Sequence, residues 1–525
     1  MKVRSKSRAL LILFFTILGI GILVRVWQFG AIPPGLNKDE ASIGVDAMSL
    51  LRYHVDRNGM SFPIHFISWG SGQNALYGYL LIPFLAFFGS SSTIIRLPML
   101  LTGIATLPLV YLVGKEIEDE KLGLLAMFFI AVSPWHIILS RWSLESNLLP
   151  FVFLVGFVLL IKSIERNGLF PLACLFFGLC LYAYGTAYAF IPIFVTAAFG
   201  WLLYMKQIRL KPFLFGIFIL FVVSLPIILF VATNTFKHDT LHLFSITIPR
   251  LPSLPRYESI SFIFHKDALK LIGGNLVTLF TLLIAQTDHD VINVVEPYGY
   301  FYLITFPFAV IGIWQLIRSI RNKTTSLKIL LLFWIGASLI IGMLQPVNFN
   351  RINIIFIPLI FCIAVFISNL SIKYRWILPG TSLILLVACS LFMHDYLGNQ
   401  YLSKNRINFF VGLEPAIQYA SSLTQNEVCI STEYHGITPA PEVYVLLAEP
   451  MDPASYLSAV NYVDPHAEFR VYRSLGRYSF GLNNCKNELT TVYIFYYQDD
   501  IPQTMAYYER KQFGDFVVLS NNTPH

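Results

Sequence analysis

Long apolar runs separated by short polar segments constrain this chain more than any other feature of its sequence. After a first run at 9–29, they lie at 94–114, 122–140, 148–163, 168–184, 187–204, 213–232, 299–318, 327–344, 352–369 and 376–393. Each is close to the ~20 residues that a helix needs to cross a bilayer. Charged residues are only 13% of the 525, against roughly a quarter in soluble domains. The sequence therefore predicts an all-α polytopic membrane protein.

Basic residues decide the expected orientation. The chain starts MKVRSKSR before an apolar run that is too long for a signal peptide and has no small-residue cleavage site. We therefore expect an uncleaved first span with a cytoplasmic N-terminus. The run at 75–88 is shorter than a span and nearer to an interfacial or re-entrant piece.

This short run fixes the side of every later loop. If it does not cross, the segments rich in Lys and Arg all lie in the cytoplasm, and if it crosses, they all lie outside. These segments are 115–121, 162–167, 205–212, 318–328 and 370–375. The positive-inside rule therefore predicts about eleven spans in a plasma membrane, with 75–88 on the outer face.

The same topology places a first loop (30–93), a long loop (233–298) and everything after residue 394 outside. Residues 395–525 alternate strand-like and helix-like stretches, which indicates a small extracytoplasmic α/β domain after a transmembrane domain at 1–394. The expected strands are Val428–Ser431, Val443–Leu447, Phe469–Tyr472, Val492–Tyr497 and Phe516–Leu519, and the expected helices are 414–424 and 452–463. Cys429 and Cys485 fall in this domain, and we predict that they form a disulfide.

The first outer loop carries two adjacent carboxylates, Asp39 and Glu40, at the start of an expected helix. Asn37 is placed to cap this helix, with Glu40 three residues on in capping-box position. Apolar residues at the spacing of one helix face follow, at Ile43, Ala47, Leu50 and Leu51. This pattern predicts a short amphipathic helix lying on the membrane. A sheltered carboxylate there can act as a general base, although acidic residues at a helix start also complement the helix dipole.

A second group of polar residues lies in SPWHIILSRWSLESN, residues 133–147, at the outer end of a predicted span. His136, Arg141 and Glu145 crowd this helix end. Ionisable residues at membrane depth are functional candidates, and His136 and Glu145 are taken as supporting residues of a site. Arg141 and Glu145 are also four residues apart, which suits a local ion pair.

Arginines recur at the outer ends of other spans, at Arg96 and Arg351. The guanidinium group is suited to binding phosphate through two hydrogen bonds, although interfacial snorkelling is common. Because these arginines run against the positive-inside trend, they favour an anionic lipid headgroup as ligand.

The long loop has His238, Asp239, His242, Asp288, His289 and Asp290, but not at the spacing of a known metal motif. We therefore predict no metal site. Lys and Arg lie in short clusters between apolar runs, so the sequence carries no signature of nucleic-acid binding either.

The order of these features resembles the polyprenyl-phosphate-sugar glycosyltransferases of class C. The resemblance is greatest to family 39, which includes protein O-mannosyltransferases and the lipid A aminoarabinose transferase. The motifs that carry it are PPGLNKDE, FGSSSTIIRLP and SPWHIILSRWSLESN, and it extends over most of residues 9–390. It implies interfacial helices in the first loop and an inverting transfer of sugar from a lipid phosphate to an extracytoplasmic protein, lipid or glycan.

The resemblance also implies roles for particular residues. Asp39 matches the catalytic base and Glu40 its acidic neighbour, while Arg96 and Arg141 match basic positions near the donor phosphate. Glu145 and Arg351 match further positions of the family. No cofactor is expected, because a neutralised phosphate is a good leaving group without a divalent metal. The β-trefoil domains of eukaryotic protein mannosyltransferases are absent, which favours a bacterial or archaeal relative.

Two other functions are open to such a chain. A flippase or transporter for a lipid-linked sugar needs ionisable or helix-breaking residues near span midpoints. A scaffold for envelope assembly would use the outer domain only for binding. The charges here gather at one face of the predicted spans, which favours chemistry at the membrane surface.

Overall fold

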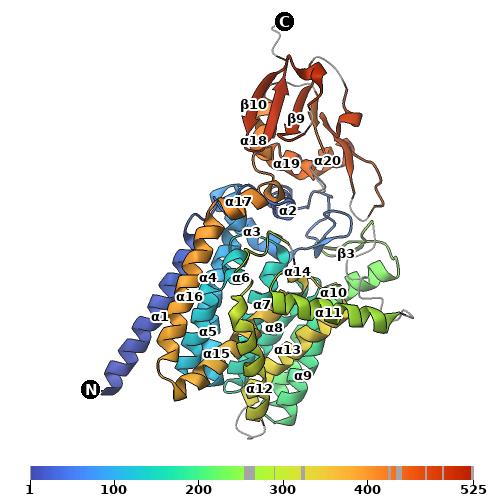
Figure 1. Ribbon diagram of the computed structural model, residues 1–525. Coiled ribbons are helices and arrows are strands. Elements are labelled where there is room, and N and C mark those ends of the chain that lie inside the picture. The colour runs from blue at the N-terminus through green and yellow to red at the C-terminus, as the bar shows by residue number, and fades with distance from the viewer. Residues whose placement is uncertain are drawn as a thin grey trace. The chain divides into compact units, whose positions relative to one another are not determined.

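The computed structural model describes residues 2–252, 267–288, 290–320, 326–423, 427–432, 440–467, 470–486, 490–499 and 501–521. The chain forms two compact units, each drawn from three separate stretches (Figure 1). Unit 1 comprises Met1–Phe29, Met99–Ile228 and Tyr257–Tyr401, and unit 2 comprises Gly30–Pro98, Leu229–Arg256 and Leu402–His525. Unit 2 therefore groups the first loop with the C-terminal segment.

Unit 1 is a bundle of helices. They are α1 (Lys2–Val26), α4 (Ser92–Ile117, which begins in unit 2), α5 (Glu120–Val132), α6 (Pro134–Leu139), α7 (Glu145–Ser163), α8 (Phe170–Ala183), α9 (Ala187–Tyr204), α10 (Leu210–Thr235, which ends in unit 2), α11 (Ala268–Ala285), α12 (Phe306–Ile320), α13 (Ser326–Leu344), α14 (Phe349–Ile352), α15 (Phe356–Lys373) and α16 (Ile377–Leu397). Close packing in the bundle depends on small residues. A Cβ on Gly114 of α4 would lie 2.6 Å from the Cα of Gly123 in α5, so only glycine permits this approach.

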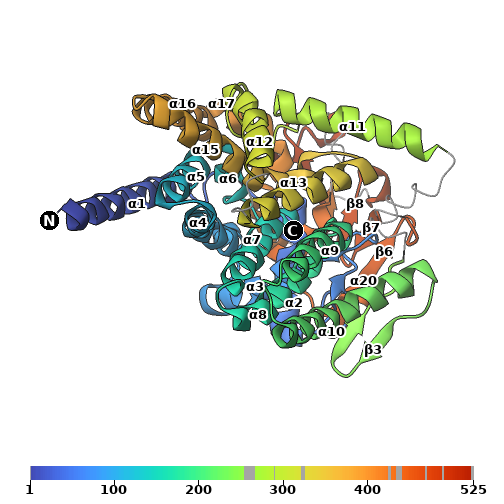
Figure 2. The same ribbon diagram turned by 90° about the horizontal axis from the view of Figure 1, so that it is seen from below.

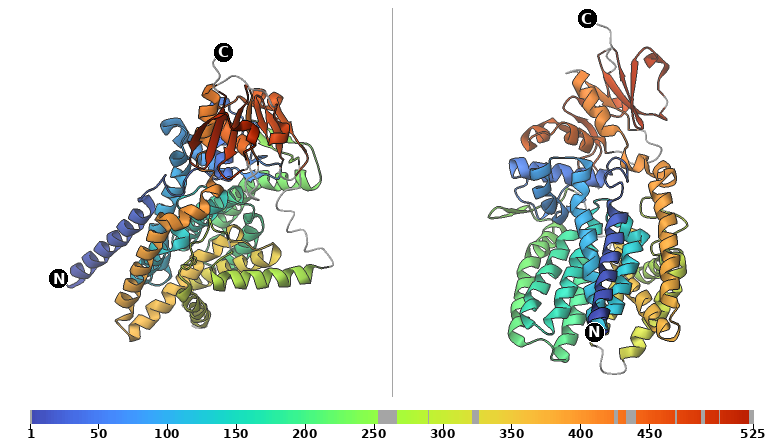
Figure 3. Two further views of the ribbon diagram at one scale, coloured as in Figure 1. Left: turned by 45° about the horizontal axis from the view of Figure 1, so that its top comes forward. Right: turned by 90° about the vertical axis from the view of Figure 1, so that its left-hand side faces the viewer.

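Ten helices of the described residues are long and apolar enough to cross a membrane, against the eleven or so predicted. The expected span 122–140 is divided into α5 and α6, because Ser133 is extended and Pro134 starts a new helix. The expected span 168–184 is the 14-residue α8. The long loop instead contains α11, a helix that the sequence analysis missed. Figures 1 and 3 show α11 running across the neighbouring helices of unit 1.

The helix predicted in the first loop is confirmed as α2 (Lys38–Tyr53), with the complete capping box at Asn37 and Glu40. Burial does not follow the predicted amphipathic pattern, because every residue from Glu40 to Leu50 is buried. The cause is packing on two sides, against α3 (Leu76–Phe88) and α19 (Pro441–Ala448). With 13 residues, α3 is too short to span a bilayer.

The C-terminal segment of unit 2 forms the predicted α/β fold. Among its described residues, seven strands form a sheet in the order β10-β11-β9-β5-β8-β7-β6, with β5 parallel to both β8 and β9 and the other pairs antiparallel. The strands are β5 (Val428–Ile430), β6 (Val460–Tyr462), β7 (Tyr472–Leu475), β8 (Tyr478–Phe480), β9 (Val492–Tyr496), β10 (Glu509–Phe513) and β11 (Phe516–Ser520). The helices are α17 (Asn399–Asn405), α18 (Leu413–Leu423), α19 and α20 (Pro453–Ala459).

Some local predictions in this segment are wrong. Val443–Leu447 was expected to be a strand but lies in α19, where Pro441 opens the helix and the apolar residues are buried on all sides. A short continuous apolar run does not by itself distinguish a buried strand from a buried helix. The helix expected at 452–463 ends at Ala459 and continues as β6. Phe469, expected to start a strand, lies outside the described residues, and the strand begins at Tyr472.

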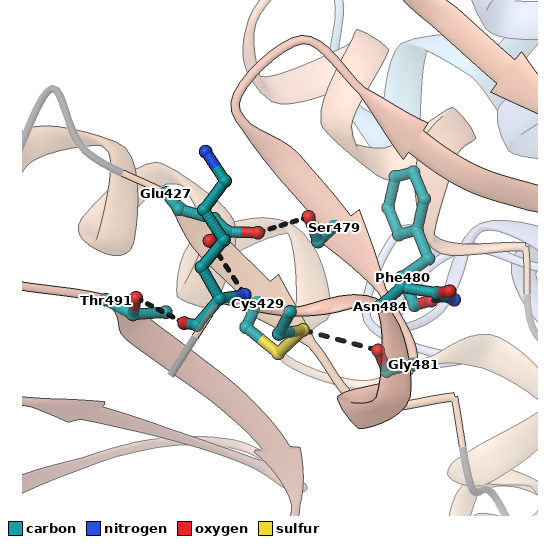
Figure 4. Close-up of a disulfide and its surroundings, with 9 residues drawn as sticks. Glu427, Cys429, Ser479, Phe480, Gly481, Asn484 and Thr491 are labelled. Atoms are coloured by element: carbon teal, nitrogen blue, oxygen red, sulfur yellow. Dashed lines mark hydrogen bonds between the residues drawn. A yellow bond between two sulfur atoms is a disulfide. The ribbon is translucent and has the colours of Figure 1, made fainter. Parts of the chain in front are cut away.

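The predicted disulfide between Cys429 and Cys485 is confirmed, with the two Cα atoms 5.7 Å apart (Figure 4). It joins the central strand β5 to the turn after β8. Hydrogen bonds around it tie the same turn to β5, because the backbone N–H of Lys486 donates to Glu427 Oε2 at 3.0 Å and Glu427 also accepts from Ser479.

Candidate active site

The first turn of α2 is fixed by its own cap. The Asn37 side chain accepts a hydrogen bond from the backbone N–H of Asp39 at 3.0 Å, and Glu40 Oε2 accepts from the N–H of Asn37 at 2.9 Å. Both bonds use N–H groups that a helix start leaves unpaired. The backbone at Asp39 is therefore held in one conformation.

Glu40 and Arg96 form a buried, bidentate ion pair. Arg96 Nε donates to Glu40 Oε1 at 2.7 Å and Nη2 donates to Oε2 at 2.6 Å, while Nη1 donates to the carbonyl of Pro33 at 2.6 Å. Both side chains are fully buried. The pair ties the start of α4 to the start of α2 and to the loop before it. Arg96 thus uses its N–H groups on protein acceptors, and its predicted contact with a donor phosphate stays a prediction.

Asp39 differs from its neighbour because its carboxylate is half-buried and only partly engaged. Its Oδ1 accepts a hydrogen bond from Trp69 Nε1 at 3.0 Å. No donor to Oδ2 is found among the described residues. A carboxylate with one oxygen oriented and the other open is suited to taking a proton.

Trp69, which the sequence analysis missed, lies in the loop between β1 (His65–Phe66) and β2 (Gln73–Asn74). Gly70 and Gly72 of this loop have φ values of 109° and 90°, which other residues rarely adopt. The guanidinium of Arg57 lies 5.9 Å from the centre of the Trp69 ring, and the Trp69 carbonyl accepts from the N–H of Arg470 at 3.0 Å. The indole is therefore held in place beside Asp39. The only signal for it in the sequence is a tryptophan within a glycine-containing loop, SWGSG.

Behind Trp69 lies a cluster of buried charged groups. Arg57 forms an ion pair with Asp46 at 3.2 Å and donates to Ser42. Burial raises the pKa of Asp46. Burial, with the charge of Asp46, raises the pKa of Asp56 to about 7, and burial likewise raises the pKa of Glu442 to about 7. Part of this cluster therefore binds protons near neutral pH.

In unit 1, Arg141 caps the end of α1. It is fully buried, and its Nη1 donates to the carbonyls of Arg25 and Trp27 at 2.7 and 2.9 Å, with Nη2 donating to that of Gln28 at 3.0 Å. A cation suits the unpaired carbonyls of a helix end.

Arg25, which the sequence analysis did not identify, caps α5 in the same way. Its guanidinium donates to the carbonyls of Ala131 and Ile130, both at 3.0 Å. Its Nη2 also lies 2.8 Å from Nδ1 of His136. Because arginine only donates, this nitrogen accepts, so we assign His136 as the neutral imidazole with its proton on Nε2. The residues predicted at 133–147 thus belong to a network around two helix ends.

The remaining predicted residues lie elsewhere in unit 1. Glu145 is buried and starts α7, where a carboxylate complements the helix dipole. Arg351, in α14, is partly exposed, and its Nη1 donates to the carbonyl of Pro346 at 2.9 Å. The structure brings Asp39, Glu40 and Arg96 together within unit 2 and His136 and Arg141 together within unit 1.

Two acidic residues of the long loop have partners elsewhere in the described structure. Asp239 pairs with Arg250 at 3.5 Å, and Asp288 accepts from the backbone N–H of Phe349 at 2.9 Å. His289 lies outside the described residues. In the part of the chain that the structure covers, no three His, Cys, Asp or Glu side chains gather as metal ligands would.

Comparisons with known proteins identify the fold. No protein-family model and no curated protein matches the sequence. The structure is similar to two class C, polyprenyl-phosphate-sugar transferases, which confirms the resemblance at the level of the fold. ArnT from Cupriavidus metallidurans bound to undecaprenyl phosphate matches with a TM-score of 0.55 and 11% identity, over 99% of this chain and 98% of that chain. The same protein in the apo state matches with a TM-score of 0.56 and 10% identity.

The second match is the archaeal oligosaccharyltransferase AglB from Archaeoglobus fulgidus, in complex with an inhibitory peptide and a dolichol-phosphate. It has a TM-score of 0.50 and 13% identity, over 81% of this chain. The chain spans only 62% of the length of that protein. The chain therefore has the ArnT fold along nearly its whole length, and it shares part of its architecture with AglB.

Proposed function

We propose that this protein is a membrane glycosyltransferase that moves a sugar from a polyprenyl-phosphate donor to an extracytoplasmic acceptor. The observation that carries the proposal is the Asp39 carboxylate, with Oδ1 oriented by Trp69 and Oδ2 open, in a chain with the ArnT fold. Undecaprenyl phosphate bound to ArnT and dolichol-phosphate bound to AglB support a lipid-linked donor.

In the proposed reaction, the acceptor hydroxyl or amine attacks the anomeric carbon of the sugar. Its proton passes to Asp39 Oδ2 as the new bond forms. The bond between the anomeric carbon and the phosphate oxygen breaks, and the electron pair leaves with polyprenyl phosphate. A single displacement of this kind inverts the anomeric centre.

Glu40 has a different part in this mechanism. Both of its oxygens accept hydrogen bonds from Arg96, and Oε2 also accepts from the N–H of Asn37. It therefore positions the helix start that carries Asp39.

The leaving phosphate needs a cation to stabilise its developing charge. Arg96, Arg141 and Arg351 are the candidate ligands. Arg96 and Arg141 are fully buried and donate to protein acceptors, whereas Arg351 is partly exposed. Arg351 therefore needs the least rearrangement to reach a headgroup, and we propose it as the first phosphate ligand to test.

The proposed site lies at the outer surface of a plasma membrane, with the N-terminus in the cytoplasm. The C-terminal disulfide supports this side, because disulfides persist in oxidising compartments.

The deciding experiment measures release of polyprenyl phosphate by the full chain in nanodiscs supplied with lipid-linked sugar. We expect Asp39→Asn to lower the rate by ~10²–10⁴-fold, the contribution of a general base. Asp239→Asn, at an exposed carboxylate of the same unit, is the matched control and should release product normally. Near-normal release by Asp39→Asn would remove Asp39 from the role, and transbilayer movement of donor without release would identify a flippase.

A further inference from the structure

A hairpin directly after α10 exposes an unusual number of large apolar side chains. It consists of β3 (Leu241–Leu243) and β4 (Ile246–Ile248), and Figure 2 shows the chain leaving the end of α10 and folding into it. Its exposed apolar residues are Leu241, Leu243, Phe244 and Ile246, and Phe236, between α10 and the hairpin, is exposed as well. Grouped apolar residues of this kind mark an interaction surface.

Phe244 forms the tip of the hairpin. Its side chain is fully exposed, at 107%, and its φ is +54°, in the left-handed region that bulky residues avoid. The turn therefore presents an aromatic ring outward in a backbone conformation that bulky residues avoid.

The strand register gathers the apolar residues on one face. Leu241 pairs with Ile248 and Leu243 pairs with Ile246, while His242 and Thr247 pair on the opposite face. Because side chains alternate along a strand, one face is apolar, and its exposed part is formed by Leu241, Leu243 and Ile246 next to the tip, while Ile248 is buried.

The base of the hairpin is tied to the last turns of α10. Asn234 Nδ2 donates to the carbonyl of Pro249 at 3.0 Å, and Asn234 Oδ1 accepts from the N–H of Leu251 at 2.7 Å. With 26 residues, α10 is a candidate span about 39 Å long at 1.5 Å per residue, longer than the ~30 Å hydrocarbon core. The end of α10, and with it the base of the hairpin, therefore falls at the level of the lipid headgroups.

The hairpin also holds part of the first loop. The backbone N–H of Ile64 donates to the carbonyl of Thr247 at 3.1 Å, and the N–H of Thr247 donates to that of Phe62 at 3.4 Å. Phe62 is itself exposed. The segment held in this way leads into the loop that carries Trp69.

We propose that the β3–β4 hairpin inserts its apolar tip into the bilayer interface at the end of α10 and holds the first loop at headgroup depth. The occupant of the apolar face is lipid, because the hairpin directly follows in the chain a candidate span whose own exposed residues suit lipid. Those of α10 include Phe215, Phe218, Phe221 and Ile228. Lys237 and Arg250, exposed near the hairpin base, then lie among the headgroups. The proposal stands independently of the transferase function.

Spin labelling tests the depth of the tip. Four cysteines are buried and the other two form the disulfide, so a nitroxide reagent reacts with an introduced cysteine. The full chain carrying Phe244→Cys or Leu243→Cys is labelled, placed in nanodiscs and measured by power saturation with oxygen and with a water-soluble nickel chelate. Tyr507→Cys, at an exposed aromatic residue before β10, is the matched control in water.

We expect oxygen to relax the labels at 243 and 244 more than the nickel chelate does, and the reverse at 507. Equal access of the chelate to positions 244 and 507 would place the tip in water and overturn the proposal. Protection of both hairpin labels from both reagents would mean that protein, not lipid, covers the tip, and would overturn it as well. If Phe244→Cys does not yield a monodisperse nanodisc complex, the label at Leu243→Cys alone shows whether lipid, water or protein surrounds the hairpin.

Discussion

The two oxygens of Asp39 have different surroundings. Oδ1 accepts a hydrogen bond from the indole N–H of Trp69, and in the proposed reaction Oδ2 takes the acceptor proton. A hydrogen bond to a charged group contributes ~1.5–3 kcal/mol, and here it would fix the direction of the second oxygen. We therefore propose Trp69 as a positioning residue.

Replacing Trp69 tests this role. Trp69→Phe keeps a ring against Arg57 but removes the N–H donor, so we expect kcat to fall by ~10-fold or more while KM for the donor is unchanged. Trp201→Phe is the control, because its N–H has no acceptor within the described structure. Steady-state release of polyprenyl phosphate measures both. An unchanged kcat for Trp69→Phe would contradict a positioning role.

Asp56 makes the stability of unit 2 depend on pH. Its pKa is raised from ~3.9 in an unfolded chain to about 7 by burial and by the charge of Asp46. The folded protein therefore holds a proton between these values that the unfolded chain has lost. The resulting stabilisation is fully present below the unfolded pKa and is lost as the pH rises through about 7.

We expect the thermal midpoint to fall as the pH is raised from weakly acidic to weakly alkaline, and the fall to be smaller in Asp56→Asn. Asparagine imitates the protonated acid and keeps Oδ1, which accepts from the N–H groups of Asn58 and Met60 at 2.9 Å. Glu442 titrates in the same direction, so some dependence should remain. Calorimetry across the pH range measures the slope, and an identical slope in the variant would exclude Asp56 as its source.

Among the elements, α2 depends on the Glu40–Arg96 pair for its position. Both groups are fully buried, so removing one leaves an uncompensated charge, at a cost of ~3–5 kcal/mol. Removing both charges together leaves no such charge.

A double-mutant cycle follows from this geometry. We expect Arg96→Met to destabilise strongly and the double variant Glu40→Gln with Arg96→Met to cost less than the sum of the single changes. The exposed pair Lys115–Glu120 is the control, where coupling should be ~0–1 kcal/mol. Denaturant unfolding in detergent gives the free energies, and additivity at the buried pair would argue against its anchoring role.

The disulfide anchors the central strand of the C-terminal sheet across 56 residues of chain. Closing a loop of this length in the unfolded state stabilises the fold by ~2–4 kcal/mol. We expect Cys429→Ala with Cys485→Ala to expose the C-terminal segment to protease at lower denaturant concentration. Reductant is the comparison. It should reproduce the effect in the wild type and leave the double variant unchanged, because the four remaining cysteines are free thiols.

At the scale of the whole molecule, topology depends on a few ambiguous helices. Counting the ten candidate spans alone places both termini on the same side, whereas the predicted eleven place them on opposite sides. Eleven spans result if α5–α6 together and α8 each cross the membrane and α11 does not. Because α11 runs across its neighbours in unit 1, we favour opposite sides (Figure 3).

Labelling of intact cells shows whether the two termini lie on opposite sides of the membrane. We expect Lys206→Cys, in the basic segment after α9, to resist a membrane-impermeant maleimide and Tyr507→Cys to react with it. Reaction at position 206 from outside would contradict the proposed topology and would mean that the number of crossings before this segment differs from the prediction.

The sequence by itself determined the features that depend on near neighbours. Most of the long apolar helices, the capping box at Asn37 and three of the C-terminal strands follow from patterns over a few residues, because helix caps and side-chain periodicity are local. The carboxylate pair Asp39–Glu40 is also visible in the sequence, and the family resemblance singles out Asp39 as the candidate base, which stays a prediction.

Only the tertiary structure decided what each polar side chain contacts. Glu40 meets Arg96 across 56 residues and Asp39 meets Trp69 across 30, and no spacing rule relates such positions. The same holds for Arg25, whose partners in α5 lie more than 100 residues away, and for α19, whose helical state depends on burial on all sides. These contacts form because packing brings distant segments together, and a buried polar group must then find a partner within reach.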